Sequence, residues 1–217
     1  MIGLCFHGVG TPERNLETDE GHYWIDETLF GAVLDEVRDR SDVAISFDDG
    51  NASDLVVGLP ALRRRGLRAS FFVLAGRLDQ PGSLSREDVR TLRSEGMTVG
   101  THGMDHVPWR GLTPVQQERE WVTARSMIEE AVRRPVSEAA LPLGRYDRSV
   151  LGRLRRLGYA RVHSSDRRPV LPGSWLVPRY SVTATDDVSS VRAQILTGPG
   201  ARRRALLELK GVAKRVR

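Results

Sequence analysis

The chain has 217 residues, 40% of them hydrophobic, which suffices for one domain over residues 1–217 without a linker. Its formal net charge of +5 comes from arginine, because Lys210 and Lys214 are the only lysines. The arginine clusters at 63–65, 153–156 and 202–204 contain no aromatic residues that would form a stacking platform, so we expect no nucleic-acid partner. The single cysteine, Cys5, excludes an internal disulfide and is compatible with a reducing compartment.

The amino terminus opens on the short apolar run Ile2-Gly3-Leu4-Cys5-Phe6, with no basic region before it. We therefore expect no signal peptide, no transmembrane segment and a cytoplasmic location. At the other end, a basic stretch at about 201–217 carries apolar residues in a pattern that indicates an amphipathic helix. We expect this helix to pack on the domain, with a dimer contact or a membrane-surface anchor as alternatives.

Short β-rich runs alternate with helical patterns along the chain, which predicts α/β architecture. We expect strands to begin near residues 2, 43, 68, 97, 138, 160 and 176. Helices are expected at about 25–38, 52–65, 86–95, 114–133 and 149–157. Ser85 and Thr113 are expected to cap two of these helices, since Asp88 and Gln116 follow three residues later.

Glycines end three of the predicted helices just before a strand, and this order predicts parallel strands with short connections: Gly66, Gly96 and Gly158. In parallel α/β folds, functional groups gather at the carboxyl ends of the strands. The candidates that follow predicted strands are His7, Asp48 and Asp49, His102 and His106, Leu143 and Gly144, and His163. We expect these residues to share one rim.

Two motifs carry the predicted chemistry, Asp48-Asp49-Gly50 and the His102/His106 pair. Two imidazoles and one carboxylate suit a divalent metal, most of all zinc, with cobalt or nickel as alternatives. The second carboxylate is then free to act as a base, which is what a metal-dependent amide or ester hydrolase requires. Each motif is weak alone, because Asp-Asp-Gly usually marks a strand-ending turn and paired histidines are often surface groups.

With these motifs in place, the region from Ile2 to Tyr180 resembles the polysaccharide deacetylases with a NodB-homology domain, carbohydrate esterase family four. Ser46-Phe47-Asp48-Asp49-Gly50 is similar to the family's Thr-Phe-Asp-Asp-Gly. His102-Gly103-Met104-Asp105-His106 is similar to its His-Ser/Thr-x-x-His, with Gly103 replacing a hydroxyl residue. The resemblance implies a distorted (β/α)7 TIM-like barrel, Asp48 as the base, and Asp49, His102 and His106 as metal ligands.

The third family motif, an Arg-x-Pro-Tyr-Gly-like stretch, is altered here to Ala140-Leu141-Pro142-Leu143-Gly144, followed by Arg145-Tyr146-Asp147. Its proline and glycine remain, but Ala140 and Leu143 stand where the family has arginine and tyrosine. The resemblance implies that the Leu143 amide serves the oxyanion, because a backbone donor does not depend on its side chain. Leu143 and Gly144 would line the substrate groove. This form of the motif is similar to family members found with exopolysaccharide and other surface glycans.

The general acid is the larger departure, because no histidine follows His163, whereas the family carries its acid near the end of the domain. In a closed barrel the first and last strands are neighbours, so His7 is expected to replace it, as in the poly-N-acetylglucosamine deacetylase branch. His163 is the alternative acid. Asp166 and Arg179 are expected to orient the acid and the base respectively, with surface ion pairing as the alternative.

The resemblance implies a metal-dependent deacetylase that hydrolyses the N-acetyl group of an acetylated amino sugar or glycan, in surface polysaccharide metabolism. A hydrolase of a small amide or an O-acetyl ester shares this chemistry and remains an alternative. Further alternatives are a noncatalytic glycan-binding descendant and a two-carboxylate glycosidase, which would need no metal.

Overall fold

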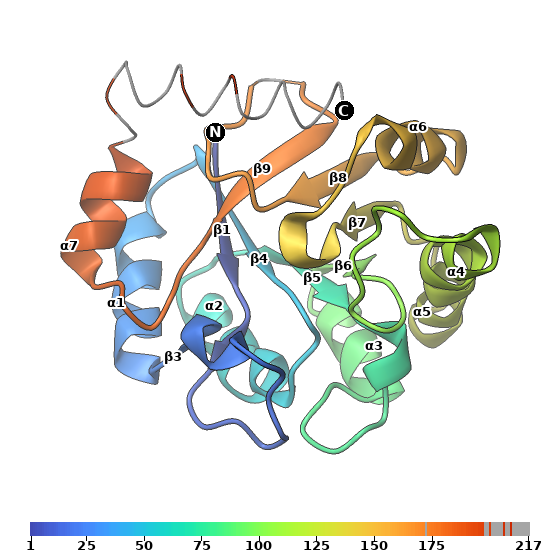
Figure 1. Ribbon diagram of the computed structural model, residues 1–217. Coiled ribbons are helices and arrows are strands. Elements are labelled where there is room, and N and C mark those ends of the chain that lie inside the picture. The colour runs from blue at the N-terminus through green and yellow to red at the C-terminus, as the bar shows by residue number, and fades with distance from the viewer. Residues whose placement is uncertain (172, 198–199, 201–205, 207–208, 210–217) are drawn as a thin grey trace.

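The computed structural model describes residues 1–171, 173–197, 200, 206 and 209. Within them, seven parallel strands form a closed barrel, and Figure 1 shows helices around its outside. The strands are β1 (Ile2–Phe6), β4 (Val43–Phe47), β5 (Ala69–Val73), β6 (Thr98–Thr101), β7 (Glu138–Ala140), β8 (Arg161–Ser164) and β9 (Leu176–Ser181). The predicted α/β class and (β/α)7 barrel are therefore confirmed, and each strand begins within one residue of its predicted start.

The five predicted helical regions are also helical in the structure, two of them as joined segments with a π-helical turn. They comprise α1 (Glu27–Val37), η2 (Asp54–Gly58) with α2 (Leu59–Arg64), α3 (Arg86–Ser94), α4 (Pro114–Glu118) with η4 (Arg119–Thr123) and α5 (Ala124–Val132), and α6 (Arg148–Arg156). Ser85 and Thr113 form the predicted capping boxes. A further helical stretch, α7 (Val188–Ser190) with η6 (Val191–Leu196), was not predicted.

The predicted helix at about 201–217 lies outside the described residues, apart from Leu206 and Leu209. In the part of the chain that the structure describes, no helix has both the length and the apolar character needed to cross a bilayer.

A small second sheet, β2 (Gly8–Val9) with β3 (Trp24–Ile25), follows the first barrel strand and was missed by the sequence analysis. The predicted helix start at about residue 25 is wrong by two residues, because Ile25 pairs with Val9 and Asp26 caps α1 by accepting from the Leu29 amide at 2.7 Å. This long-range pairing overrides the local helical pattern. The short helix η1 (Glu20–Tyr23) precedes β3. We call the intervening residues 10–23 the crossing segment.

Side chains alternate between the two sides of the barrel wall, as strand geometry requires. Phe6 and Phe47 face the helices, and their rings lie 5.0 and 5.9 Å from the ring of Phe30 on α1. Their neighbours Cys5 and Ser46 face inward. The same two strands thus supply apolar residues to the core and polar residues to the barrel interior.

The barrel closes where β1 pairs with both β4 and β9. Gly3 lies opposite Arg179 in this pairing, and a Cβ at Gly3 would come within 2.9 Å of the Arg179 Cγ atom. Only glycine therefore leaves room for the Arg179 side chain inside the barrel. The closure confirms that the first and last strands are neighbours, and it brings Arg179 close to the segment after β1.

Candidate active site and metal centre

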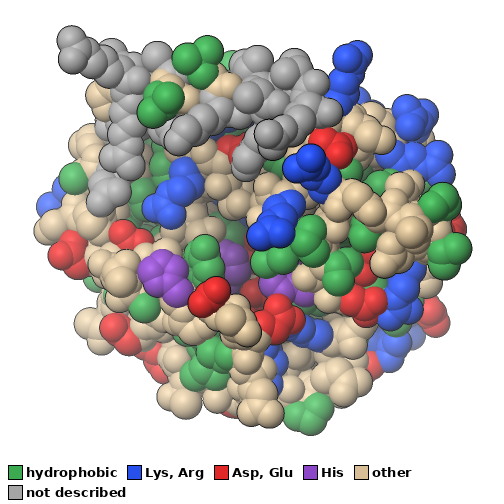
Figure 2. All heavy atoms as spheres, in the orientation of Figure 1, with side chains coloured by type: hydrophobic (Ala, Val, Ile, Leu, Met, Phe, Trp, Pro, Cys, Tyr) green, Lys and Arg blue, Asp and Glu red, His purple; other side chains and the backbone are tan. Residues whose placement is uncertain are grey.

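A cavity of about 410 Å³ opens at the carboxyl ends of the barrel strands. Figure 2 shows histidine side chains on this face of the molecule, with acidic side chains beside them. The predicted residues that line the cavity are His7, Asp48, Asp49, His102, His106, Leu143, Gly144 and Arg179. Separate strand ends therefore converge on one rim as expected, but the expectation was wrong for His163, which is not among the lining residues.

Asp49, His102 and His106 form a compact cluster of potential ligands. The Asp49 Oδ1 atom lies 3.5 Å from Nε2 of His102 and 3.5 Å from Nε2 of His106. This oxygen is buried and has no hydrogen-bond partner among the described residues. Asp49 and His106 both have positive φ, 76° and 55°, a strained backbone that persists where surrounding structure enforces it. The cluster meets the spacing expected of a metal centre.

The other ring nitrogen of each histidine is already engaged. Nδ1 of His102 lies 3.0 Å from the Ala140 carbonyl, and Nδ1 of His106 lies 2.7 Å from Oε2 of Glu17. A carbonyl and a carboxylate only accept, so each Nδ1 donates and each Nε2 keeps its lone pair. This is the arrangement of a metal-binding imidazole, in which an outer partner fixes the tautomer.

The pKa shifts of His102 and Asp49 favour the protonation states that bind a cation, a neutral imidazole and an ionised carboxylate. Burial lowers the pKa of His102 to about 4, so its imidazole is neutral near neutral pH. Burial opposes ionisation of Asp49, but the neighbouring imidazoles of His7, His102 and His106 outweigh it and lower the pKa of this carboxyl. A buried carboxylate facing two imidazole lone pairs therefore fits a divalent metal such as zinc.

Asp48 lies beside this cluster and has a different partner. Arg179 donates to both of its oxygens, each at 2.7 Å, and the two side chains are only 5% and 3% exposed. Burial opposes the charge on Asp48, but Arg179 overcomes it and holds the pKa of the carboxyl far below its ordinary value. Arg179 thus contacts Asp48 as the sequence analysis expected, and it keeps the carboxylate ionised and oriented.

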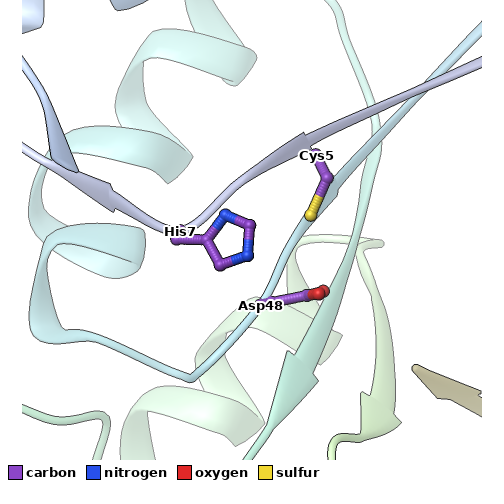
Figure 3. Close-up of side chains that lie close together, drawn as sticks. All are labelled: Cys5, His7 and Asp48. Atoms are coloured by element: carbon purple, nitrogen blue, oxygen red, sulfur yellow. The ribbon is translucent and has the colours of Figure 1, made fainter. Parts of the chain in front are cut away.

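His7 follows β1 and reaches the cavity on the side of Asp48. Figure 3 shows it near Cys5 and Asp48, and potential ligand atoms of these three residues lie within 4.8 Å of one another. A metal does not suit this second group, because the Arg179 guanidinium bonds both Asp48 oxygens and lies 3.2 Å from the Cys5 sulfur. Burial also raises the pKa of the Cys5 thiol. The geometry instead suits His7 for proton transfer next to Asp48.

The residues after β7 form the short helix η5 (Pro142–Gly144) at the cavity rim. The Gly144 amide donates to the Leu141 carbonyl at 3.1 Å, so it is not available to a ligand. Leu143 has a φ of 54° and its side chain is exposed at the rim. A Cβ at Gly144 would lie 2.0 Å from the Ser165 hydroxyl, which explains the glycine. Of the two predicted residues, only Leu143 is a candidate amide donor.

Neither His163, the alternative acid, nor Asp166, which was expected to orient the acid, is among the residues that line the cavity. Nε2 of His163 lies 2.9 Å from Oε2 of Glu138, and its ring packs 4.5 Å from the ring of Phe72. Burial lowers the pKa of His163 despite the opposing effect of Glu138. Asp166 accepts hydrogen bonds from the Tyr146 hydroxyl at 2.5 Å and from the Ser164 hydroxyl at 2.8 Å. Both residues follow or belong to β8.

Glu120 on η4 is a buried residue that the sequence analysis missed. Its carboxylate accepts from the amides of Met104 and Asp105, at 2.8 and 3.1 Å, and from the Trp109 indole at 3.3 Å. A Cβ at Gly103 would lie 2.3 Å from Glu120 Oε2, so this carboxylate occupies the space of any side chain there. Gly103 also has a φ of 89°, so both its backbone conformation and the adjacent carboxylate favour glycine at this position. No local spacing signals a partner this far along the chain.

Glu17 and Tyr23 of the crossing segment were also missed as site residues. Glu17 contacts His106, and the Tyr23 ring packs 4.8 Å from the His7 ring. Burial disfavours the charge on Glu17, but His106 and Arg77 outweigh it and lower the pKa of this carboxyl. Neither residue belongs to a motif, and only the folded path of the segment places them at the cavity.

Comparisons with known proteins agree with this geometry. The sequence profile of the polysaccharide deacetylase family matches residues 35–162, more than half of the chain. The Bacillus subtilis (strain 168) protein YxkH is 26% identical over 170 residues, which cover 72% of this chain and 61% of YxkH. Peptidoglycan-N-acetylglucosamine deacetylase PgdA of Listeria monocytogenes is 41% identical over 66 residues, 30% of this chain and 13% of PgdA. The chain therefore spans less than two thirds of either relative.

Solved structures show the same fold. Streptococcus pyogenes deacetylase PplD, in complex with acetate, superposes with a TM-score of 0.77 at 17% identity, covering 90% of this chain and 97% of PplD. IcaB from Ammonifex degensii gives a TM-score of 0.69 at 21% identity, covering 87% of this chain and 92% of IcaB. From the family match, the barrel and the two motifs, this chain belongs to the polysaccharide deacetylase family, a family of hydrolases.

Replacing Glu120 with Gln tests its hold on the histidine loop. The amide keeps one accepting oxygen but turns an NH2 group toward N–H donors, so we expect the free energy of unfolding to fall by about 1–3 kcal/mol. Urea denaturation measures this change. Glu118→Gln, an exposed position on α4, is the matched control and should be close to neutral. Equal stability of the two variants would contradict the assigned role.

Asp54 tests whether burial and the nearby charges of Asp48 and Asp49 act on the site as described. Both of its oxygens are buried without a hydrogen-bond partner among the described residues, and burial, then repulsion from Asp49 and Asp48, raises its pKa well above the ordinary value. As pH rises, the unfolded carboxyl ionises first, so the folded state loses stability toward the raised pKa. Asp54→Asn removes this loss.

We therefore expect the stability of Asp54→Asn relative to the wild type to grow as pH rises from about 4 to about 8. Urea denaturation of metal-free protein across this range measures the difference. Asp39→Asn, whose carboxylate is 86% exposed, should give a much flatter difference. A difference for Asp54→Asn that does not change with pH would refute this electrostatic account.

Proposed function

We propose that this chain is a metal-dependent deacetylase that hydrolyses the N-acetyl group of an acetylated amino sugar or glycan. Membership of the polysaccharide deacetylase family supports deacetylation of glycans. The observation that carries the proposal is the buried, unpartnered Asp49 oxygen facing Nε2 of His102 and of His106, with the Arg179-bound Asp48 beside it. The Asp49 carboxylate is thus placed to bind a cation, and the Asp48 carboxylate to accept a proton.

In this proposal, Asp49, His102 and His106 hold the metal, with zinc the first choice and cobalt or nickel the alternatives. When bound, such an ion supplies Lewis-acid polarisation of a carbonyl and acidifies a water molecule. Asp48 accepts the proton of the attacking water. Because Arg179 fixes both Asp48 oxygens, the base keeps its orientation before and after it takes the proton.

The remaining proposed roles concern the oxyanion and the leaving amine. The Leu143 amide donates to the oxyanion at the cavity rim, since the neighbouring Gly144 amide is already bonded to Leu141. His7 donates a proton to the departing amine, because an unprotonated amine is a poor leaving group. We prefer His7 to His163 because His7 lines the cavity next to Asp48, whereas His163 bonds Glu138 and packs on Phe72.

For the substrate, we propose an N-acetylated polymer of the cell surface. PgdA is named a peptidoglycan-N-acetylglucosamine deacetylase, and the open cavity at the barrel rim suits an extended chain entering from solvent. Asp166 accepts from the Tyr146 and Ser164 hydroxyls, and its expected role in orienting the acid stays a prediction.

Acetate release from N-acetylglucosamine oligomers tests the proposed reaction. Chelator-treated protein should release no acetate, and adding zinc, cobalt or nickel should restore release, because without the ion nothing polarises the acetyl carbonyl or acidifies the attacking water. An O-acetylated sugar assayed in parallel distinguishes an amide hydrolase from an esterase. Chelator-resistant acetate release would refute the metal-dependent mechanism, and the absence of release with every metal would refute the proposed substrate class.

The assignment of the acid is tested by His7→Gln, with His163→Gln as the matched variant. Loss of a general acid costs about 10²–10⁴-fold, so we expect kcat of His7→Gln to fall by this factor while its KM changes little. His163→Gln should keep most of its turnover, provided thermal unfolding shows that it is folded. The reverse result, an active His7→Gln and a folded but inactive His163→Gln, would assign the acid to His163.

A further inference from the structure

The crossing segment brings a carboxylate onto one of the two histidines of the proposed metal centre. Oε2 of Glu17 lies 2.7 Å from Nδ1 of His106, although the two residues are 89 positions apart. We infer that Glu17 is a positioning residue, which fixes the His106 ring in the tautomer and orientation that direct Nε2 toward Asp49. This inference rests on the proposed metal-dependent function and adds a residue to it that belongs to no motif.

His106 needs such a partner more than His102 does. His102 directly follows β6, and its ring bonds the backbone carbonyl of Ala140 on the neighbouring strand, so the barrel itself holds it. His106 lies in a loop, at a φ of 55°, where the backbone does not limit the ring as a strand would. A hydrogen bond from Nδ1 fixes both the tautomer and the rotation of an imidazole.

Glu17 is itself held on its other oxygen. The Arg77 guanidinium bonds Oε1 of Glu17, so the carboxylate bridges a fixed cation and the His106 ring. Arg77 ends the short helix η3 (Ala75–Arg77), whose Ala75 and Gly76 amides donate to the Gly103 and Met104 carbonyls at 2.9 and 3.1 Å. The anchor of Glu17 is therefore tied to the same loop that carries His106.

The crossing segment is also tied to the acid side of the cavity. Glu20 accepts from the Glu17 amide at 2.7 Å and pairs with Arg14. Arg14 donates to Asn51 at 2.9 Å, and Asn51 donates to the His7 carbonyl at 3.1 Å. One hydrogen-bonded network thus connects the backbone of the proposed acid to the backbone of Glu17, whose carboxylate bonds the proposed metal ligand His106.

The geometry separates positioning from two other roles for Glu17. Direct metal ligation is disfavoured, because both oxygens are occupied by Arg77 and His106. A contribution to global stability alone is also disfavoured, because the Glu17 side chain is 46% exposed and ion pairs at such sites contribute little. The expected effect is on metal affinity, where loss of an outer partner weakens binding about 10–100-fold.

Zinc affinity and the His106 tautomer test this inference in Glu17→Ala and Glu17→Gln. Competition with a chromophoric chelator should show zinc binding about 10–100-fold weaker in Glu17→Ala. Glu17→Gln should recover part of this loss, because its carbonyl oxygen still accepts from Nδ1. Glu13→Gln, an exposed position in the same segment, is the control and should bind zinc as the wild type does.

The second readout needs no metal and no activity. Long-range ¹H–¹⁵N spectra of metal-free protein should show the Nδ1-protonated tautomer of His106 in the wild type, and a mixture of tautomers in Glu17→Ala. An unchanged tautomer together with unchanged zinc affinity in Glu17→Ala would overturn the inference. Failure of the wild type to release acetate would overturn the proposed function alone, because the tautomer and zinc readouts still report on Glu17.

Discussion

The buried ion pair between Arg179 and Asp48 is the interaction on which the rest of the site depends. Moving two charges out of water costs several kcal/mol per ion, so the pair persists only with good geometry and further hydrogen bonds. Arg179 meets this condition by bonding both Asp48 oxygens and the Ser46 hydroxyl. Since Arg179 lies on β9 and Asp48 follows β4, the pair links the strands on either side of β1 and keeps the carboxylate charged inside the barrel.

Two adjacent carboxylates remain ionised here because each has its own partners. The Asp48 carboxylate bonds Arg179. Asp49, the next residue, has a positive φ, and its own carboxylate lies toward His102 and His106. Repulsion between neighbouring charges would otherwise raise one pKa, as it helps to do for the unpartnered Asp54. Because their partners differ, Asp49 can bind the metal ion in the proposed reaction while Asp48 accepts the proton of the attacking water.

Acidic side chains from distant segments hold the loop between the two histidines. Glu120 accepts from two amides of this loop and from the indole of Trp109, which follows the loop, and Glu17 bonds His106. The Glu120 carboxylate is buried, so satisfying its donors orders the loop more strongly than the half-exposed Glu17 can. The glycine at position 103 leaves the space that the Glu120 carboxylate occupies.

The sequence by itself determined the class of fold, the seven strand starts to within one residue, and most of the motif residues that meet at the rim, His163 excepted. It did so because period-two and helical patterns, capping boxes and helix-ending glycines are local, and because parallel strands bring their carboxyl ends together. The choice of His7 over a later histidine also came from sequence, through the closure of the barrel, and its catalytic role stays a prediction.

Only the tertiary structure decided the β2–β3 pairing, the partners of the histidines, and which amide at the rim is available. Glu17 and Glu120 belong to no motif, and their contacts span intervals that no periodicity encodes. The sequence pointed to the Leu143 amide, and only the structure shows that the neighbouring Gly144 amide is bonded to Leu141. Local patterns specify the backbone, whereas the ionisation and orientation of these side chains depend on burial and on neighbours that only the closed barrel brings within reach.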